Sequence, residues 1–206
     1  MDMVNIAEIR KIIESSPQIS IDSVSQITSH VGGLRSSFTV KKDFIVDYEK
    51  KEAKVFTSIS GVEGRSEVKE FFHNQKKNVS AYGLDGRLLD SRTETFTEEQ
   101  YSSLFSHEGE LKVVDFDVLV PNSINKDNNV SFHTEKMPKN ICCLLGDSIS
   151  ENDVDMSSNV LLTICSEDTL KINSLAYGKQ KNQEDSLLTA DTEIIIHLCE
   201  NCNLLF

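Results

Sequence analysis

The nearest approach to a chemical motif in this sequence is the cysteine pair of Cys199-Glu-Asn-Cys202. A redox Cys-x-x-Cys pair depends on a helix N-terminus that lowers the pKa of its first thiol. Only four residues of the sequence follow Cys202, which is too few for such a helix. The sequence therefore favours buried or edge-strand thiols over a redox centre, because free cysteine behaves as a small apolar residue.

A zinc site is the alternative use of these thiols, with His197 as a nearby nitrogen ligand. A structural zinc ion needs two more ligands, and the other close pair, Cys142-Cys143, is adjacent in sequence. Adjacent residues of a strand point to opposite faces, so that pair would supply one ligand at most. Cys199, Cys202 and His197 are kept as candidate metal ligands, and the expected cofactor content is none.

The other residue types that carry catalysis are present without the spacing that catalysis needs. The five histidines stand singly, and no segment matches the local patterns of serine hydrolases, metalloproteases or cysteine proteases. The loop Gly61-Val-Glu-Gly64 lacks the spacing of a phosphate loop, and Glu63 would repel a phosphate. We therefore predict that the chain is not an enzyme, and we name no catalytic residue.

Acidic residues outnumber basic ones by 33 to 21, a formal net charge of −12. Residues 1–60 carry eight charges of each sign, so the whole excess lies in residues 61–206. Proteins bind polyanions through Lys and Arg, so nucleic-acid binding by residues 61–206 is not expected. With no run of about 18 apolar residues and no secretory signal, the sequence predicts no membrane span and an intracellular, cytoplasmic location.

Apolar periodicity predicts two short helices at the N-terminus, joined by a link that contains Pro17. The first begins at a capping box formed by Asn5 and Glu8, and isoleucines recur on one of its faces. The second runs from Ser20 to the glycine pair at 32–33, with apolar residues three and four positions apart. A β-hairpin rich in aromatic and β-branched residues is then expected from Phe44 to Ile59.

The centre of the chain mixes helix and hairpin signals. A helix is predicted from Ser66 to Lys76, because apolar residues share a face and lysines stand at its C-terminal end. Asp85-Gly86 indicates a tight hairpin turn, and Thr97-Glu-Glu-Gln100 is a capping box that opens a further helix. After Gly109, apolar and alternating runs separated by Asn, Ser, Gly and Pro favour strands.

The predicted fold class is α+β. It consists of short N-terminal helices with a hairpin, central helices, and a mostly antiparallel C-terminal sheet or small sandwich. At 206 residues the chain is expected to form one domain. Residues 1–60, a helix pair plus hairpin, and the acidic, β-rich residues 61–206 are possible subdomains.

The segment IRKIIESSPQISIDSVSQITSHVG, residues 9–32, resembles the first two helices of winged-helix domains. The likeness lies in the Pro-containing link, the Ile-Ser-Ile run before the second helix, and the later hairpin. It implies nucleic-acid binding in which Arg35, Lys41 and Lys42 would contact phosphates. The sequence departs from the pattern at Gly32-Gly33, and LRSSFTVKKDF is a poor recognition helix because of its β-branched residues and modest basic charge.

The leading functional hypothesis is a non-enzymatic binding or assembly protein that takes a protein partner or self-associates. The apolar end Leu204-Leu205-Phe206 is the candidate interaction terminus, and packing on the protein's own core is the alternative reading. An acidic chain of this size, rich in Asn, Ser and Ile, also fits a viral accessory or structural protein. Two other hypotheses are a winged-helix-like nucleic-acid-binding protein and a zinc- or thiol-dependent protein that uses the C-terminal cysteines.

Overall fold

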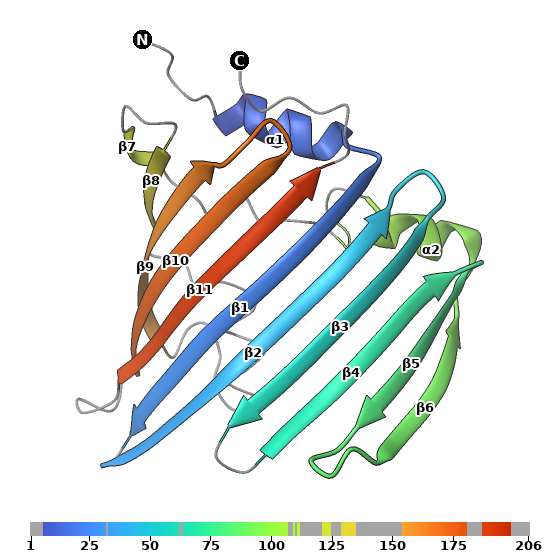
Figure 1. Cartoon of the computed structure of the whole chain (residues 1–206), viewed down its shortest axis with the longest axis horizontal. Coiled ribbons are helices and arrows are strands. Elements are labelled where there is room, and N and C mark those ends of the chain that lie inside the picture. Colours follow the sequence, from blue (N-terminus) through green and yellow to red (C-terminus); the bar gives the residue numbers. More distant parts are fainter. Residues whose placement is uncertain are drawn as a thin grey trace.

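The structure is a computed structural model that describes residues 6–31, 33–61, 64–106, 109, 111, 121–124, 129–134, 154–180 and 187–198. Eleven strands within these ranges form one antiparallel sheet, in the order β6-β5-β4-β3-β2-β1-β11-β10-β9-β8-β7 (Figure 1). The elements in chain order are α1 (Ile6–Ser15), β1 (Gln18–Val31), β2 (Leu34–Asp47), β3 (Glu52–Gly61), β4 (Gly64–His73), β5 (Lys76–Tyr82), β6 (Leu88–Thr95), α2 (Glu98–Leu104), β7 (Pro121–Ile124), β8 (Asn129–Thr134), β9 (Val154–Ile164), β10 (Thr169–Gln180) and β11 (Leu187–Leu198).

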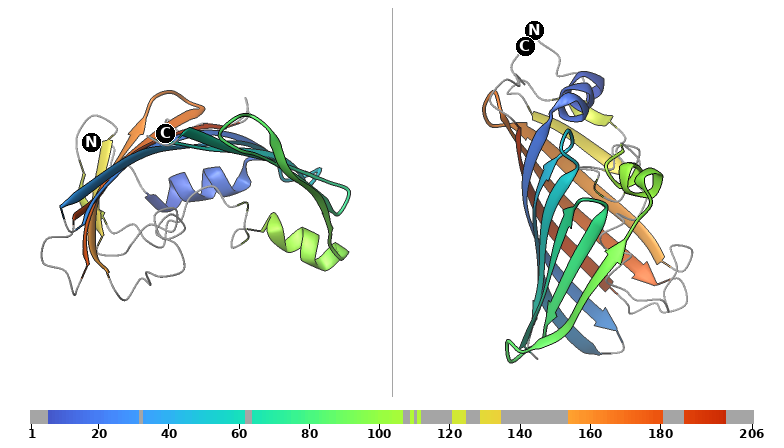
Figure 2. Two further views of the ribbon diagram at one scale, coloured as in Figure 1. Left: turned by 90° about the horizontal axis from the view of Figure 1, so that it is seen from below. Right: turned by 90° about the vertical axis from the view of Figure 1, so that its right-hand side faces the viewer.

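The sheet is strongly curved, and both helices lie on its concave side (Figure 2, left). Most neighbouring strands in the sheet are also neighbours in sequence. The exception is the pair in the middle of the sheet, where β1 lies beside β11 from the C-terminal part of the chain. The described strands therefore form a meander, the arrangement that short hairpin turns produce.

Helix α1 covers the part of the concave face formed by β1, β11, β10 and β9. Its Ile9 and Ile13 are buried against isoleucines and leucines of these strands, including Ile21 and Ile196. The helix ends before Pro17, which has no N–H to continue the helical hydrogen bonds. Burial of this isoleucine stripe, rather than helix propensity, accounts for the stability of so short a helix.

Helix α2 covers the concave face of β2 to β4. Its Tyr101 and the C-cap residue Phe105 pack in a cluster with Phe72, whose ring meets that of Phe105 edge-on at 6.5 Å between centroids. The Tyr101 hydroxyl donates to the Lys51 carbonyl, and Lys51 Nζ donates to Ser102 Oγ at 2.8 Å. The helix is thus fixed both by apolar packing and by hydrogen bonds to the turn between β2 and β3.

Side-chain alternation gives the sheet two distinct faces. Ile21, Phe44, Val55 and Glu70 are register partners on consecutive strands, and Ile21 packs with the α1 cluster, so this row faces the concave side. Successive residues of a strand point to opposite faces. The residues before and after each member of the row therefore face the convex side.

The predicted second N-terminal helix is wrong, because residues 18–31 form β1. Ile19, Ile21 and Ile27 share the buried concave face, which is the two-residue period of a strand. Val24, which completed the apparent helical spacing, points to the other face. Serine and β-branched residues fill the remaining positions, and β-branched residues favour strands over helices.

The predicted helix from Ser66 to Lys76 is also wrong. These residues form most of β4, a two-residue turn at Asn74 and Gln75, and the start of β5. Both turn residues have positive φ, 50° and 59°, as type I′ hairpin turns require. Asparagine tolerates this left-handed backbone, so the Asn-Gln pair sets the hairpin register.

Several local predictions are confirmed. Helix α1, the hairpin of β2 and β3, the Asp85-Gly86 turn and the strands over 154–198 are all present. The capping box is formed in both directions: Gln100 N donates to Thr97 Oγ1 at 3.2 Å, and Thr97 N donates to Gln100 Oε1 at 3.0 Å. The α+β class is nevertheless wrong, because the described residues are nearly all antiparallel strand with two short helices.

The adjacent residues Phe71 and Phe72 offer a matched test of the two faces. Phe72 is fully buried under α2, whereas Phe71 lies on the convex face with 37% of its surface exposed. We expect Phe72→Ala to lower the free energy of unfolding by about 3–5 kcal/mol, and Phe71→Ala by only about 1 kcal/mol. Urea unfolding of both variants measures this, and equal losses would contradict the assignment of the faces.

Tyr48, which packs against the cluster that contains Phe72, provides a pH test of the packing on the concave face. Burial raises its pKa to about 12 from 10.0, and its hydroxyl donates to the Leu111 carbonyl at 3.0 Å. The folded state therefore holds a proton that the unfolded state releases from about pH 10 upward, so this group's contribution to stability falls between about pH 10 and 12. In Tyr48→Phe, unfolding followed by circular dichroism should show a shallower decline over that range, and an unchanged slope would contradict this account.

Candidate functional site

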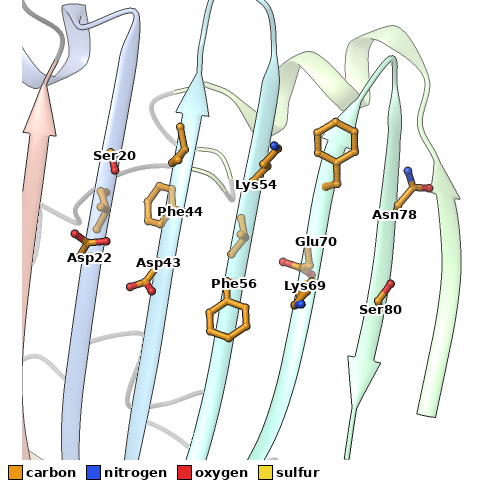
Figure 3. Close-up of a pocket in the computed structure, with 14 residues that line it drawn as sticks. Ser20, Asp22, Asp43, Phe44, Lys54, Phe56, Lys69, Glu70, Asn78 and Ser80 are labelled. Atoms are coloured by element: carbon orange, nitrogen blue, oxygen red, sulfur yellow. The ribbon is translucent and has the colours of Figure 1, made fainter. Parts of the chain in front are cut away.

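A groove with a volume of about 530 Å³ lies on the sheet across β1 to β5 (Figure 3). Its convex lining consists of two rows of register partners, each with one residue from each of the five strands. The Ile45 row contains Ser20, Ile45, Lys54, Phe71 and Asn78, and the Phe56 row contains Asp22, Asp43, Phe56, Lys69 and Ser80. We call these ten residues the convex groove.

The middle of the convex groove is apolar. Ile45, Phe56 and Phe71 come from β2, β3 and β4 and alternate between the two rows, so they are diagonal neighbours in the sheet. Diagonal neighbours of this kind lie about 7–8 Å apart and remain within reach of aromatic side chains. Ile45 is 59% exposed and Phe71 37% exposed, so the floor of the groove has apolar surface that is not covered by the described part of the chain.

Two carboxylates occupy one end of the convex groove. Asp22 on β1 and Asp43 on β2 are direct register partners, and like charges placed opposite one another are destabilising. Asp22 has His197 Nε2 at 3.9 Å from its carboxylate. Asp43 has no hydrogen bond or ion pair with any residue that the structure describes. This end is therefore negative and only weakly neutralised.

Two ammonium groups stand on β3 and β4, the strands that also carry Phe56 and Phe71. Lys54 on β3 places its Nζ 5.9 Å from the centre of the Phe71 ring, and Lys69 on β4 places its Nζ 5.3 Å from that of Tyr82. Such contacts hold a cation against an aromatic face while one side stays open to water. Neither lysine is ion-paired with an acidic group among the described residues. The convex groove therefore carries carboxylates on β1 and β2, ammonium groups on β3 and β4, and the neutral Asn78 and Ser80 on β5.

The structure places His197, a sequence-predicted metal ligand, on the exposed convex face of β11. Its Nδ1 lies 3.3 Å from Thr169 Oγ1. Within the described ranges, no three His, Cys, Asp or Glu side chains are placed to hold a metal ion. Cys199 and Cys202 lie outside the described residues, as does the interaction terminus Leu204-Leu205-Phe206, so these predictions stay predictions.

The basic residues of the nucleic-acid alternative do not form one surface. Arg35, Lys41 and Lys42 all lie on β2, because the segment proposed as a recognition helix is a strand. Lys41 and Lys42 are adjacent and point to opposite faces, and Arg35 lies about 20 Å from Lys41 along the strand. The winged-helix resemblance therefore keeps its first helix, α1, but loses its second helix and its recognition helix to β1 and β2, and the three basic residues are not brought together.

The β6 edge of the sheet is relevant to self-association. Asp90, Arg92 and Glu94 of this exposed edge strand face the concave side, because they are register partners of Ala81, Val79 and Lys77. Arg92 contacts Asp90 at 2.5 Å and Glu94 at 3.1 Å. Inward-pointing charges on an edge strand disfavour pairing with another strand. This edge therefore does not favour assembly by strand addition.

Comparison with known proteins gives structural likenesses alone. No family model and no curated protein matches the chain. Neisserial surface protein A aligns at 6% identity and a TM-score of 0.32, covering 89% of this chain and 98% of that protein. The translocator domain of the autotransporter NalP from Neisseria meningitidis aligns at 8% identity and a TM-score of 0.35, covering 94% of this chain and 93% of that domain. A DUF1329 family protein from Desulfovibrio piger aligns at 10% identity and a TM-score of 0.32, covering 98% of this chain and 96% of that protein.

The intracellular, cytoplasmic location and the viral source expected from the sequence find no support among these neighbours, which include a surface protein and an autotransporter domain, and neither expectation is kept. With every TM-score below 0.5, the likenesses assign no family, compartment or function to this chain. The sequence also predicted no membrane span. Of the helices in the described ranges, neither is long and apolar enough to cross a bilayer.

Sequence reasoning missed the residues of the convex groove because each looks ordinary alone. Lys69 and Phe71 were assigned to a helix, which would have removed β4 from the sheet. The available signal was the two-residue alternation of Asp43 with Ile45 and of Lys54 with Phe56, which places both pairs on one face. Aligning those strands through their hairpin turns would have brought the ten residues together.

The opposed carboxylates generate a stability prediction. Asp43→Asn is expected to raise the free energy of unfolding by about 0.5 kcal/mol at low ionic strength, because it removes repulsion from Asp22. Adding Asp22→Asn to that variant should raise the free energy of unfolding little further, because the repulsion is already gone. The stability gained by Asp43→Asn should be smaller in added salt, which screens exposed charges. Urea unfolding of the two single variants and the double variant measures this coupling, and a loss of stability in Asp43→Asn would refute it.

Proposed function

We propose that this chain is a non-enzymatic binding protein and that its ligand occupies the convex groove. The observation that carries the proposal is the arrangement of ten side chains from five strands around one volume of about 530 Å³, in which exposed apolar side chains stand beside charged ones. This volume lies within the range of about 300–1,000 Å³ that is usual for small-molecule sites. Ligand sites also typically combine apolar contact with a few placed polar groups.

The construction of the convex groove favours binding over a purely structural role. Ile45, Phe56 and Phe71 stand on strands whose opposite faces are packed beneath α1 and α2, so their backbone is held in place before a ligand arrives. A preformed site avoids the cost of ordering side chains and loops on binding. Exposed apolar area removed from water by a ligand contributes roughly 25 cal/mol per Å².

The fluorescent anion 8-anilinonaphthalene-1-sulfonate tests this proposal, because its aromatic body suits the apolar floor and its sulfonate can contact a lysine beside that floor. We expect saturable binding with a fluorescence increase. Replacing Phe56 and Phe71 by Ser should weaken binding at least about fivefold, the loss that corresponds to roughly 1 kcal/mol of contact. Fluorescence titration measures both affinities.

The matched control is the double change Leu161→Ser and Leu175→Ser. These leucines lie on the convex faces of β9 and β10 and are each 38% exposed, close to the 37% of Phe71, but they are outside the convex groove. The control should bind the dye as the unaltered protein does. Equal loss in both double variants, or no loss in either, would overturn the proposal.

A further inference from the structure

We propose that one end of the sheet binds the surface of a lipid bilayer. Two hairpin tips carry this inference: the first tip is residues 33–35, where β1 meets β2, and the second tip is residues 83–89, where β5 meets β6. The leucines of the tips enter the bilayer interface, and their arginines contact lipid phosphates. Both tips lie outside the convex groove, so the inference goes beyond the proposed function and does not depend on it.

The two tips lie at the same end of the sheet. Because β1 to β6 form an antiparallel meander, the turns after β1 and β5 fall at one end and the turns after β2 and β4 at the other. Figure 1 shows both tips along the lower edge of the sheet, and Figure 2 (right) shows them at the end away from both helices. The tips are four strand spacings apart, about 19 Å across the sheet. A flat surface can therefore contact both tips together.

The most exposed large apolar side chains of the described residues gather at these tips. Leu34 is 80% exposed at the first tip, and Leu89 and Leu84 are 71% and 62% exposed at the second. Leu88 at the second tip and Leu187, at the same end of β11, are exposed as well. Single exposed apolar residues are ordinary on a soluble protein, whereas apolar residues gathered on one surface mark an interaction site.

The first tip is surrounded by basic charge in a chain whose net charge is −12. Residues 23–42, which include most of β1 and β2, contain three basic residues and no Asp or Glu. Leu187, His30 and Arg35 are consecutive register partners beside the tip, so apolar and basic side chains adjoin there. Arg35 has no ion pair with any residue that the structure describes. Its guanidinium is therefore available to a phosphate, for which its planar donor geometry is suited.

The second tip repeats this combination of leucine and arginine. Arg87 Nε lies 3.2 Å from an Asp85 carboxylate oxygen, and both side chains are more than half exposed. An exposed ion pair of this kind contributes little free energy, so a lipid phosphate can replace the carboxylate at small cost. Tyr82 stands at the base of the tip, with Lys69 Nζ 5.3 Å from its ring centre. Tyrosine and lysine are both suited to the headgroup layer, since each has an apolar body and a polar end.

A bilayer fits this arrangement better than a protein partner does. Stable protein interfaces have a contiguous apolar core inside a polar rim. Here the leucines stand on two separate tips, and on β4 between them Arg65 is exposed and ion-paired with Glu67 at 2.8 Å. A bilayer takes up each tip separately, and its phosphate layer adjoins its apolar layer as Arg35 and Arg87 adjoin the leucines.

The chain contains no tryptophan, so one introduced tryptophan reports on a chosen surface. Leu88→Trp places the reporter at the second tip, and Leu175→Trp places it on the convex face of β10, away from the tips. Vesicles of phosphatidylcholine mixed with phosphatidylglycerol should shift the Leu88→Trp emission to shorter wavelength until it saturates. Brominated lipids in the same vesicles should quench that emission. Leu175→Trp should show neither effect, and equal effects on both reporters would contradict insertion of the tip.

Leucine variants of the full chain test the apolar contacts. Leu84→Ser with Leu89→Ser should weaken binding to the same vesicles at least about tenfold in a sedimentation assay, because two apolar side chains no longer leave water. The matched control is Leu161→Ser with Leu175→Ser, which removes two exposed leucines from the convex face and should bind vesicles as the unaltered chain does. Circular dichroism checks that both double variants are folded, as expected for changes at exposed positions.

An arginine variant tests the phosphate contact. Arg35→Gln should weaken binding to the mixed vesicles about fivefold, which corresponds to the roughly 1 kcal/mol that one basic residue contributes near an anionic bilayer. Lys171→Gln makes the same change of charge near the opposite end of β10 and should leave the affinity unchanged. Equal losses in the two variants would refute the assignment of Arg35 to a lipid phosphate.

The remaining outcomes decide between a bilayer and other partners. Absence of vesicle binding by the unaltered chain, or equal binding by the Leu84/Leu89 variant, would overturn the inference. A Leu88→Trp emission shift that grows with protein concentration without lipid would also overturn it, because the tips would then contact a second copy of the chain. Dye binding in the convex groove is measured without lipid, so the proposed function stands or fails separately.

Discussion

Burial of the concave face by α1 and α2 is the constraint on which the rest of the structure depends. Side chains of a strand alternate with a period of two, so the residues that lie under a helix determine which residues face outward. Ile21 packs with α1, and Phe72 packs with α2. A one-residue slip in any strand from β1 to β5 would bury its groove residues and expose its core residues. The convex groove is therefore a consequence of packing on the opposite face.

The turns between β1 and β5 carry this register from one strand to the next. Gly33 adopts φ 80° between β1 and β2, and Asn74 and Gln75 adopt positive φ between β4 and β5. Between β2 and β3, Asp47 Oδ1 accepts from Lys50 N at 2.9 Å. Each turn joins neighbouring strands locally, so the convex groove is assembled by contacts close in sequence. Such contacts cost little loop-closure entropy compared with pairing of distant segments.

The sequence predicted the parts of the fold that short-range chemistry determines. The Thr97 capping box, the Asp85-Gly86 turn and the isoleucine stripe of α1 each depend on a few adjacent residues, and each is present. Residues 20–31 failed because Val24, on the convex face, completes a spacing that suits a helix as well as a strand. Choosing between the two periods requires knowing which residues are buried by α1, and that is tertiary information.

The candidate site was beyond single-sequence reasoning for a related reason. No residue of the convex groove is unusual by itself, and the meaning of Asp43 lies in its register partners, Asp22 on one side and Phe56 on the other. Register across several strands must be known before such a group is recognisable. The C-terminal cysteines could be recognised as a candidate site because they are close in sequence, whereas the groove residues are close only in the sheet.

The opposed aspartates connect the stability of the sheet to its proposed function. A threonine or an opposite charge at either position would satisfy the usual preferences of cross-strand pairs, so Asp22 and Asp43 impose a local cost on the fold. Departures from local consistency of this kind concentrate at functional sites.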